Sequence, residues 1–210
     1  MNDSSGDASA RLVEAAAALF AAHGYGAISI DRIASAIGAT KGLFYHHYSA
    51  KADLLADIVL SAREALLESA RQAVADLPED APAETRIEAL ALGEMSAAFA
   101  APDACRIAAD ADAILGGARL SSAHAEKRER ARAARAELEQ MYLEAYRAGV
   151  RAGRLEPLPP RFAVWLIRLP ILAAADWGAS PEGARTPADR VAEVVARFAA
   201  RGLREPTDLG

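Results

Sequence analysis

Apolar residues recur every three to four positions along most of the chain, which is the spacing of one face of an α-helix. The first such run begins at Ser9, carries Leu12, Ala16 and Phe20, and ends at Gly24, a residue suited to a helix terminus. The same spacing predicts helices over residues 30–37, 41–47, 50–74, 85–100, 103–115, 120–153, 160–177 and 187–201. The fold is therefore predicted to be all-α, with about nine helices.

Composition agrees with this fold class. The chain has 210 residues, of which 52% are hydrophobic, and its alanine-rich segments favour helices because alanine loses no side-chain entropy there. A single cysteine, Cys105, cannot form an intrachain disulfide, and the first residues do not resemble a secretory signal. The longest apolar stretch is interrupted by Arg168 and Pro170 and is therefore not a membrane span. We expect a soluble, cytoplasmic protein without a cofactor.

Breaks in the helical pattern divide the chain into segments. The proline- and acid-rich sequence from Asp76 to Glu84 is the clearest linker. The predicted organisation is a disordered N-terminus (1–8), a helix-turn-helix domain (9–50), a connecting helix (51–75), a linker (76–84), a second helical domain (85–203) and a C-terminal tail (204–210).

Two short helices joined by a glycine turn form the most informative pattern. Ser29 stands where an N-cap is expected, with Ile28 and Ile33 placed as a hydrophobic staple around it. Gly38 ends this helix, and Thr40 is placed to cap the next one, which begins at Lys41. This arrangement predicts a helix-turn-helix whose second helix, about 40–47, is the reading helix.

The reading helix lies in a segment without acids, although the whole chain has a net charge of −5. No Asp or Glu stands between Arg32 and Asp53, so a local basic surface remains possible on an acidic protein. Lys41 can donate to guanine or to a phosphate, Gly42 lets the backbone approach base edges closely, and Leu43 can contact a thymine methyl. These three residues are the predicted base contacts.

Other polar side chains around this helix are suited to phosphates. Ser29 and Thr40 stand at helix N-termini, where a hydroxyl and free backbone N–H groups together hold an anion. The further predicted phosphate contacts are Tyr45, His47 and Lys51, whereas His46 is left open between DNA contact and solvation. A metal site at the two histidines is disfavoured, because adjacent helical residues point about 100° apart and no further ligands are close in sequence.

The segment "ISIDRIASAIGATKGLFYHHYSAKADLL" resembles the signature of the TetR family of bacterial transcriptional regulators. The resemblance covers Ser9 to about Leu67, and beyond residue 68 it extends only to general architecture. It implies a homodimeric regulator, most simply a repressor of a near-palindromic operator, with an N-terminal DNA-binding domain and a C-terminal domain that binds a small effector. One departure is Ala50, where relatives usually have Ser, Thr or Asn directly before the lysine.

The C-terminal half carries apolar residues that suit a ligand pocket or plain core. The pocket candidates are Met95, Phe99, Ile107, Met141, Tyr142, Tyr146, Trp165 and Leu169. Glu94 and Arg168 are charges on apolar faces and are assigned to an interface or a pocket rim. The dimer is predicted to be a four-helix bundle formed by the last two helices of each subunit, with Leu166, Leu169, Ala173, Val191, Val194, Val195 and Phe198 at the seam.

Two other functional classes compete with this interpretation. An enzyme would need a nucleophile with its base, or a metal cluster, and no such spacing is found among four histidines and one cysteine. Asp110 and Asp112 stand two residues apart, point to different helix faces and are assigned to the surface. A helical DNA-binding or interaction protein that dimerises without binding a ligand remains the alternative. The predicted partners are double-stranded operator DNA, a second copy of the chain and an unidentified small effector, with no membrane.

Overall fold

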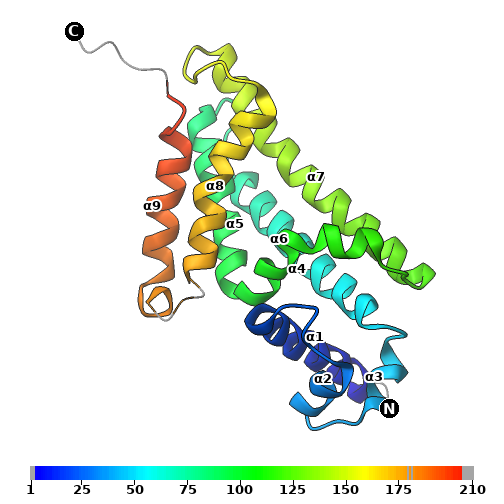
Figure 1. The fold of residues 1–210 in the computed structure, drawn as a ribbon. Coiled ribbons are helices and arrows are strands. Elements are labelled where there is room, and N and C mark those ends of the chain that lie inside the picture. The colour runs from blue at the N-terminus through cyan, green and yellow to red at the C-terminus, as the bar shows by residue number, and fades with distance from the viewer. Residues whose placement is uncertain (1–2, 179, 181, 205–210) are drawn as a thin grey trace. The chain divides into compact units, whose positions relative to one another are not determined.

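The computed structural model describes residues 3–178, 180 and 182–204, and within these ranges it is an all-α protein (Figure 1). The described helices are α1 (Asp3–His23), α2 (Ile30–Ala36), α3 (Lys41–His47), α4 (Lys51–Ala75), α5 (Ala83–Ala100), α6 (Pro102–Gly117), α7 (Ser122–Arg151), α8 (Pro160–Gly178) and α9 (Ala188–Arg201), with a 3-10 turn at Gly183–Arg185. The predicted fold class is confirmed. No helix among the described residues has the length and hydropathy to cross a membrane.

Most helix ends lie within three residues of their predicted positions, because local signals set them. Ser29 accepts a hydrogen bond from the backbone N–H of Arg32 at 3.2 Å, which confirms it as the N-cap of α2. Gly24 and Gly38 follow α1 and α2 with φ of +81° and +70°, in the left-handed region that glycine adopts without strain. Helix α8 continues through Pro170.

Helix α1 begins at Asp3 and so includes residues 3–8 of the segment that was predicted to be a disordered N-terminus; residues 1 and 2 lie outside the described residues. The helix extends N-terminal to the first apolar position, and a prediction based on the spacing of apolar residues does not detect such an extension. At the other end, Arg204 pairs with Leu155 in an isolated antiparallel bridge, so the predicted tail begins no earlier than residue 205, and 205–210 lie outside the described residues.

The chain forms two compact units. Each unit consists of two segments of the chain. The first unit combines the N-terminal segment up to Arg63 with Asp103–Ala133, and the second combines Glu64–Pro102 with the segment that starts at Ala134. Helices α4 and α7 therefore supply residues to both units. The predicted domain 85–203 does not coincide with the second unit, since residues 103–133 group with the N-terminal helices.

Each unit has its own hydrophobic core. In the first, Leu12, Ile33, Phe44 and Leu55 are buried together with Leu115 of α6. In the second, α5, α8 and α9 contact one another pairwise, as Figure 1 shows, around buried residues that include Ile87, Tyr142 and Ile167. Gly93 of α5 permits close packing on α4 in this unit, because a Cβ there would lie 2.5 Å from the carbonyl oxygen of Ser69.

Candidate nucleic-acid interface

Helices α2 and α3 pack in the first unit through a few apolar side chains. Ile33 of α2 and Phe44 of α3 are fully buried, while Leu43 is half-buried. The ring of Phe44 lies 5.6 Å from that of Tyr45 in an edge-on arrangement. Burial of Phe44 fixes which face of α3 turns inward, and the other face is left to solvent.

The outward face of α3 carries most of the predicted DNA contacts. Lys41, Gly42, Tyr45 and His46 are exposed, and the side chain of Tyr45 is 51% accessible despite its apolar ring. Gly42 is not required by the protein itself, since a Cβ there would meet nothing closer than the Thr40 Oγ1, at 3.5 Å. An exposed glycine weakens a short helix, and no packing contact within the protein requires one here.

Lys41 is paired in the unbound protein. Its Nζ donates to Oδ2 of Asp31 at 2.9 Å, and both side chains are largely exposed. The hydrogen bond to Asp31 raises the pKa of the lysine. Asp31 stands directly before the acid-free segment, and the sequence reasoning missed that it reaches the reading helix.

Lys51, at the first position of α4, is engaged within the protein. Its ammonium donates to the carbonyl oxygens of Tyr25 and Ile28 at 2.6 and 2.7 Å and lies 4.2 Å from the centre of the Tyr25 ring. Partial burial lowers the pKa of the Lys51 ammonium. Two of its three N–H bonds thus hold the connection between α1 and α2.

Two predicted details differ in the structure. Thr40 stands at the N-cap of α3, but its side chain makes no capping hydrogen bond. The histidines also differ from expectation: His46 is exposed, whereas Nε2 of His47 is buried without a hydrogen-bond partner. Of the two rings, His46 is therefore the more accessible.

The predicted pocket residues do not gather in one place. Met95, Tyr142 and Tyr146 are buried in the core of the second unit, with Phe99 and Met141 packed against it. Ile107 packs against the core of the first unit instead. Trp165 and Leu169 are 54% and 44% exposed on α8, because helical periodicity does not distinguish a core face from an uncovered apolar face.

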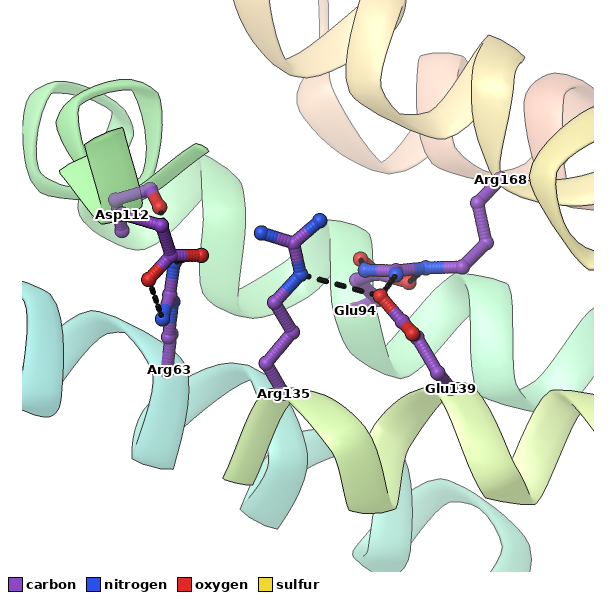
Figure 2. Close-up of polar contacts among 7 residues, drawn as sticks. Arg63, Glu94, Asp112, Arg135, Glu139 and Arg168 are labelled. Carbon is purple, nitrogen blue, oxygen red and sulfur yellow. Dashed lines mark hydrogen bonds and ion pairs between the residues drawn. The ribbon is translucent and has the colours of Figure 1, made fainter. Parts of the chain in front are cut away.

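A buried ionic group lies in the second unit, where Figure 2 shows Arg168 of α8 and Glu94 of α5 directed toward each other. Nη2 of Arg168 donates to Oε1 of Glu94 at 2.5 Å and its Nε donates to Oε2 at 3.3 Å, which is bidentate geometry. The Tyr142 hydroxyl donates to the same Oε2 at 3.0 Å, and Glu139 lies 3.6 Å from the guanidinium. Glu94 and Arg168 are core residues rather than the predicted interface or rim.

Electrostatics in this group follow from burial. Burial lowers the pKa of the Arg168 guanidinium, but the Glu94 carboxylate more than offsets this, so the pKa lies above its ordinary value. Burial and the nearby Glu94 carboxylate raise the pKa of the Tyr142 hydroxyl. The guanidinium stays charged and the phenol stays a hydrogen-bond donor.

An uncovered apolar face lies on α8 and α9, within the second unit. The predicted seam residues Leu169, Ala173, Val194 and Phe198 are exposed, and Phe198 reaches 66%. Leu166, Val191 and Val195 are half-buried. The sequence reasoning missed Phe162, Leu172 and Trp177, which are also exposed, although their helical spacing with Leu169 could have identified them.

Comparison with known proteins identifies the helix-turn-helix. Residues 12–58 match the family model of bacterial regulatory proteins of the tetR family. These residues form a helix-turn-helix that is similar to that of the tetR family. The match spans most of α1, all of α2 and α3 and the start of α4, and so includes the exposed face of the reading helix.

Solved structures of TetR-family regulators are similar in fold to most of the chain. The regulator PfmR from Thermus thermophilus is 24% identical, with a TM-score of 0.72, over 93% of this chain and 100% of that one. A tetR-family protein from Rhodococcus RHA1 is also 24% identical, with a TM-score of 0.74, over 93% and 96% of the two chains. The ketosteroid regulator KstR2 of Mycobacterium tuberculosis is 19% identical, with a TM-score of 0.75, over 98% and 97%. No curated relative matches the sequence. The fold is thus that of a TetR-family transcriptional regulator.

Proposed function

We propose that this chain is a homodimeric, cytoplasmic transcriptional repressor that binds a near-palindromic operator and releases it when a small effector binds. The observation that carries the proposal is the outward face of α3, where Lys41, Gly42 and Tyr45 are exposed and the glycine has no packing role. In this proposal the N-terminal helix-turn-helix, residues 9–50, reads DNA, and the region within 85–203 dimerises and binds the effector.

In this proposal the bases are contacted by Lys41, Gly42 and Leu43. The residues that contact phosphates or lie beside them are Ser29, Thr40, Tyr45, His46, His47 and Lys51. Lys41 leaves Asp31 when it meets DNA, because a guanine or phosphate then replaces the carboxylate as its acceptor. Lys51 keeps its two carbonyl partners and offers its remaining N–H to a phosphate. A two-fold dimer spaces the two reading helices about 34 to 36 Å apart.

The apolar face of α8 and α9 supports dimerisation. Exposed Trp165, Leu169 and Phe198 are the kind of aromatic and aliphatic side chains that occupy the centre of stable interfaces. Replacing Phe198 with Glu puts a charge at that centre, and we expect it to yield monomers in sedimentation analysis and to lower operator affinity. Arg190→Glu, at an exposed position of the same helix with a charged side chain already, is the matched control and should leave the dimer intact.

The test of DNA binding begins with selection of bound fragments from a random DNA pool by the purified full-length chain. Operator affinity is then measured by fluorescence anisotropy for wild type, Lys41→Ala, Tyr45→Phe and Gly42→Ala. We expect Lys41→Ala to weaken operator binding by about tenfold or more and to relax specificity at one base pair of each half-site. Tyr45→Phe should weaken all sequences alike, since a phosphate contact carries no sequence information.

Gly42→Ala separates folding from recognition. The alanine meets no steric obstacle in the protein and favours helix, so the thermal midpoint should be unchanged or higher while operator affinity falls. Wild-type affinity in both Lys41→Ala and Gly42→Ala would refute the proposed contacts. Failure of the wild-type chain to enrich any sequence would refute the proposed function.

A further inference from the structure

Tyr48 joins the end of the reading helix to two other helices of the first unit. It follows α3 directly, is 2% exposed, and its backbone N–H donates to the carbonyl oxygen of Phe44. Its hydroxyl lies 3.0 Å from Oγ of Ser9 on α1 and 3.1 Å from Oδ2 of Asp57 on α4. The phenol is therefore the point at which α3 is fixed against α1 and α4.

The direction of these hydrogen bonds can be worked out. A carboxylate only accepts, so the single hydroxyl hydrogen of Tyr48 goes to Asp57, and Ser9 donates to the phenol oxygen. Burial, with the charge of Asp57, raises the pKa of the Tyr48 hydroxyl to about 12. The donor to Asp57 is thus present throughout the physiological pH range.

Asp57 is held in turn by α7. Nζ of Lys127 donates to its other oxygen, Oδ1, at 2.6 Å, and Nε2 of His124 lies 3.6 Å from the same atom. The Asp57 side chain is 19% exposed and that of Lys127 is 34% exposed, so water screens their interaction only in part. Ser9, Tyr48, Asp57 and Lys127 form one continuous chain of hydrogen bonds, named the tyrosine relay below.

A second contact, one turn earlier on α4, fixes the same part of α7. Asp53 is 1% exposed, and its Oδ1 accepts the backbone N–H of Ser121, directly before α7, at 3.1 Å. Nδ1 of His124 lies 3.5 Å from that oxygen and 2.7 Å from Oγ of Ser121. Asp53 and Asp57, four residues apart, thus face the first two turns of α7 from one side of α4.

We propose that the tyrosine relay positions the reading helix, so that Asp57 and Lys127 control operator recognition without touching DNA. The relay lies wholly within the first unit, and every member is supplied by a different element. A positioning role of this kind acts through α3, and therefore rests on the proposed function of α3 in binding DNA. It makes residues 121–127 of the chain a determinant of DNA specificity, although no helix-turn-helix motif includes them.

The proposal predicts a selective loss of affinity. Loss of one hydrogen bond of the relay lets residue 48 and the end of α3 move. This movement weakens contacts to bases, which need exact side-chain placement, more than contacts to phosphates. We expect Tyr48→Phe and Lys127→Met each to weaken binding to the selected operator by about tenfold, and binding to random-sequence DNA by less than about twofold. Lys127→Arg, which restores a cationic donor, should recover most of the operator affinity.

Arg132→Met is the matched control, because Arg132 lies on the same helix and pairs with Glu129 at 3.1 Å on an exposed surface outside the relay. It should bind operator as wild type does. The double variant Tyr48→Phe with Lys127→Met should lose no more than either single variant, since both break one chain of interactions. Multiplicative losses in this cycle would overturn the relay.

A second readout does not need DNA. Amide hydrogen exchange of residues 41–48 should be faster in Tyr48→Phe and Lys127→Met than in wild type and Arg132→Met. Unchanged exchange, or operator affinity equal to wild type in both relay variants, would refute the inference while leaving the proposed function in place. Absence of DNA binding by the wild-type chain would refute both.

Discussion

Each of the two units buries an arginine against a carboxylate, but the carboxylates differ in their access to water. In the first unit, Arg63 is 5% exposed and donates to both oxygens of Asp112, which is 37% exposed. In the second unit, Arg168 is 13% exposed and its partner Glu94 only 3%. Figure 2 shows both pairs. The carboxylate of the first pair therefore reaches water, whereas the carboxylate of the second pair is almost completely removed from it.

The cost of losing either arginine should reflect this difference. A carboxylate that can reach water tolerates the loss of its partner, but one that is sealed in the core is left charged in a low-dielectric environment. The comparison therefore predicts that the same substitution, arginine to methionine, has unequal effects in the two units.

The largest effect is expected for Arg168→Met. The variant keeps an apolar stem of similar length and leaves Glu94 with the Tyr142 hydroxyl as its remaining neutral donor. We expect the free energy of unfolding to fall by about 3 kcal/mol, as measured by urea denaturation at pH 7. A loss below about 1 kcal/mol would mean that Glu94 relaxes to water in the variant.

A second substitution in that background sharpens the explanation. Glu94→Gln removes the buried charge and keeps an oxygen to accept from Tyr142, so Arg168→Met with Glu94→Gln should regain about 2 kcal/mol over Arg168→Met alone. The same denaturation experiment provides the measurement. If the double variant is less stable than the single one, packing rather than charge explains the loss.

Arg63→Met should have a smaller effect. The Asp112 carboxylate remains hydrated in the variant. Arg63 also donates to the carbonyl oxygen of Ala108, which is part of helix α6. We expect a loss of about 1 kcal/mol in the free energy of unfolding. Equal losses for Arg63→Met and Arg168→Met would contradict the comparison between the two units.

The two pairs also mark how far the sequence could predict this molecule. Helices, the Ser29 cap and the glycine turns follow from residues close together in the chain, and these predictions held. Glu94 and Arg168 are separated by 74 positions, so no spacing pattern could pair them. Asp112 was assigned to the surface without a partner from another helix, because its partner Arg63 is also remote in sequence.

Prediction from sequence was limited in the same way for two other features, the apolar face of α8 and the surroundings of Lys41. The apolar pattern of α8 indicates apolar faces but not which of them the protein covers, and it therefore could not predict that Trp165 is exposed. The acid-free segment around Lys41 was correctly read from the sequence, yet Asp31 reaches that lysine from the neighbouring helix. Local sequence patterns predict which side chains share a helix face, and tertiary packing decides what that face meets.

The smallest expected effect concerns Tyr48, whose hydroxyl donates to Asp57 in the first unit. The hydroxyl of Tyr142 donates to Glu94 in the second unit in the same way. For Tyr48 the folded pKa of about 12 exceeds an unfolded value of about 10, so the native state holds the proton more tightly. Its stabilising contribution is complete below about pH 10 and declines as the pH rises through 12, because the unfolded chain releases its proton first.

Tyr48→Phe lacks this ionisation and isolates it from the other groups that titrate at high pH. The stability difference between wild type and Tyr48→Phe should be constant from pH 7 to 9 and should shrink between about pH 10 and 12. Urea denaturation of both proteins across this range measures it. A difference that grows with pH would mean that the phenolate is favoured in the folded state, which would contradict donation from Tyr48 to Asp57.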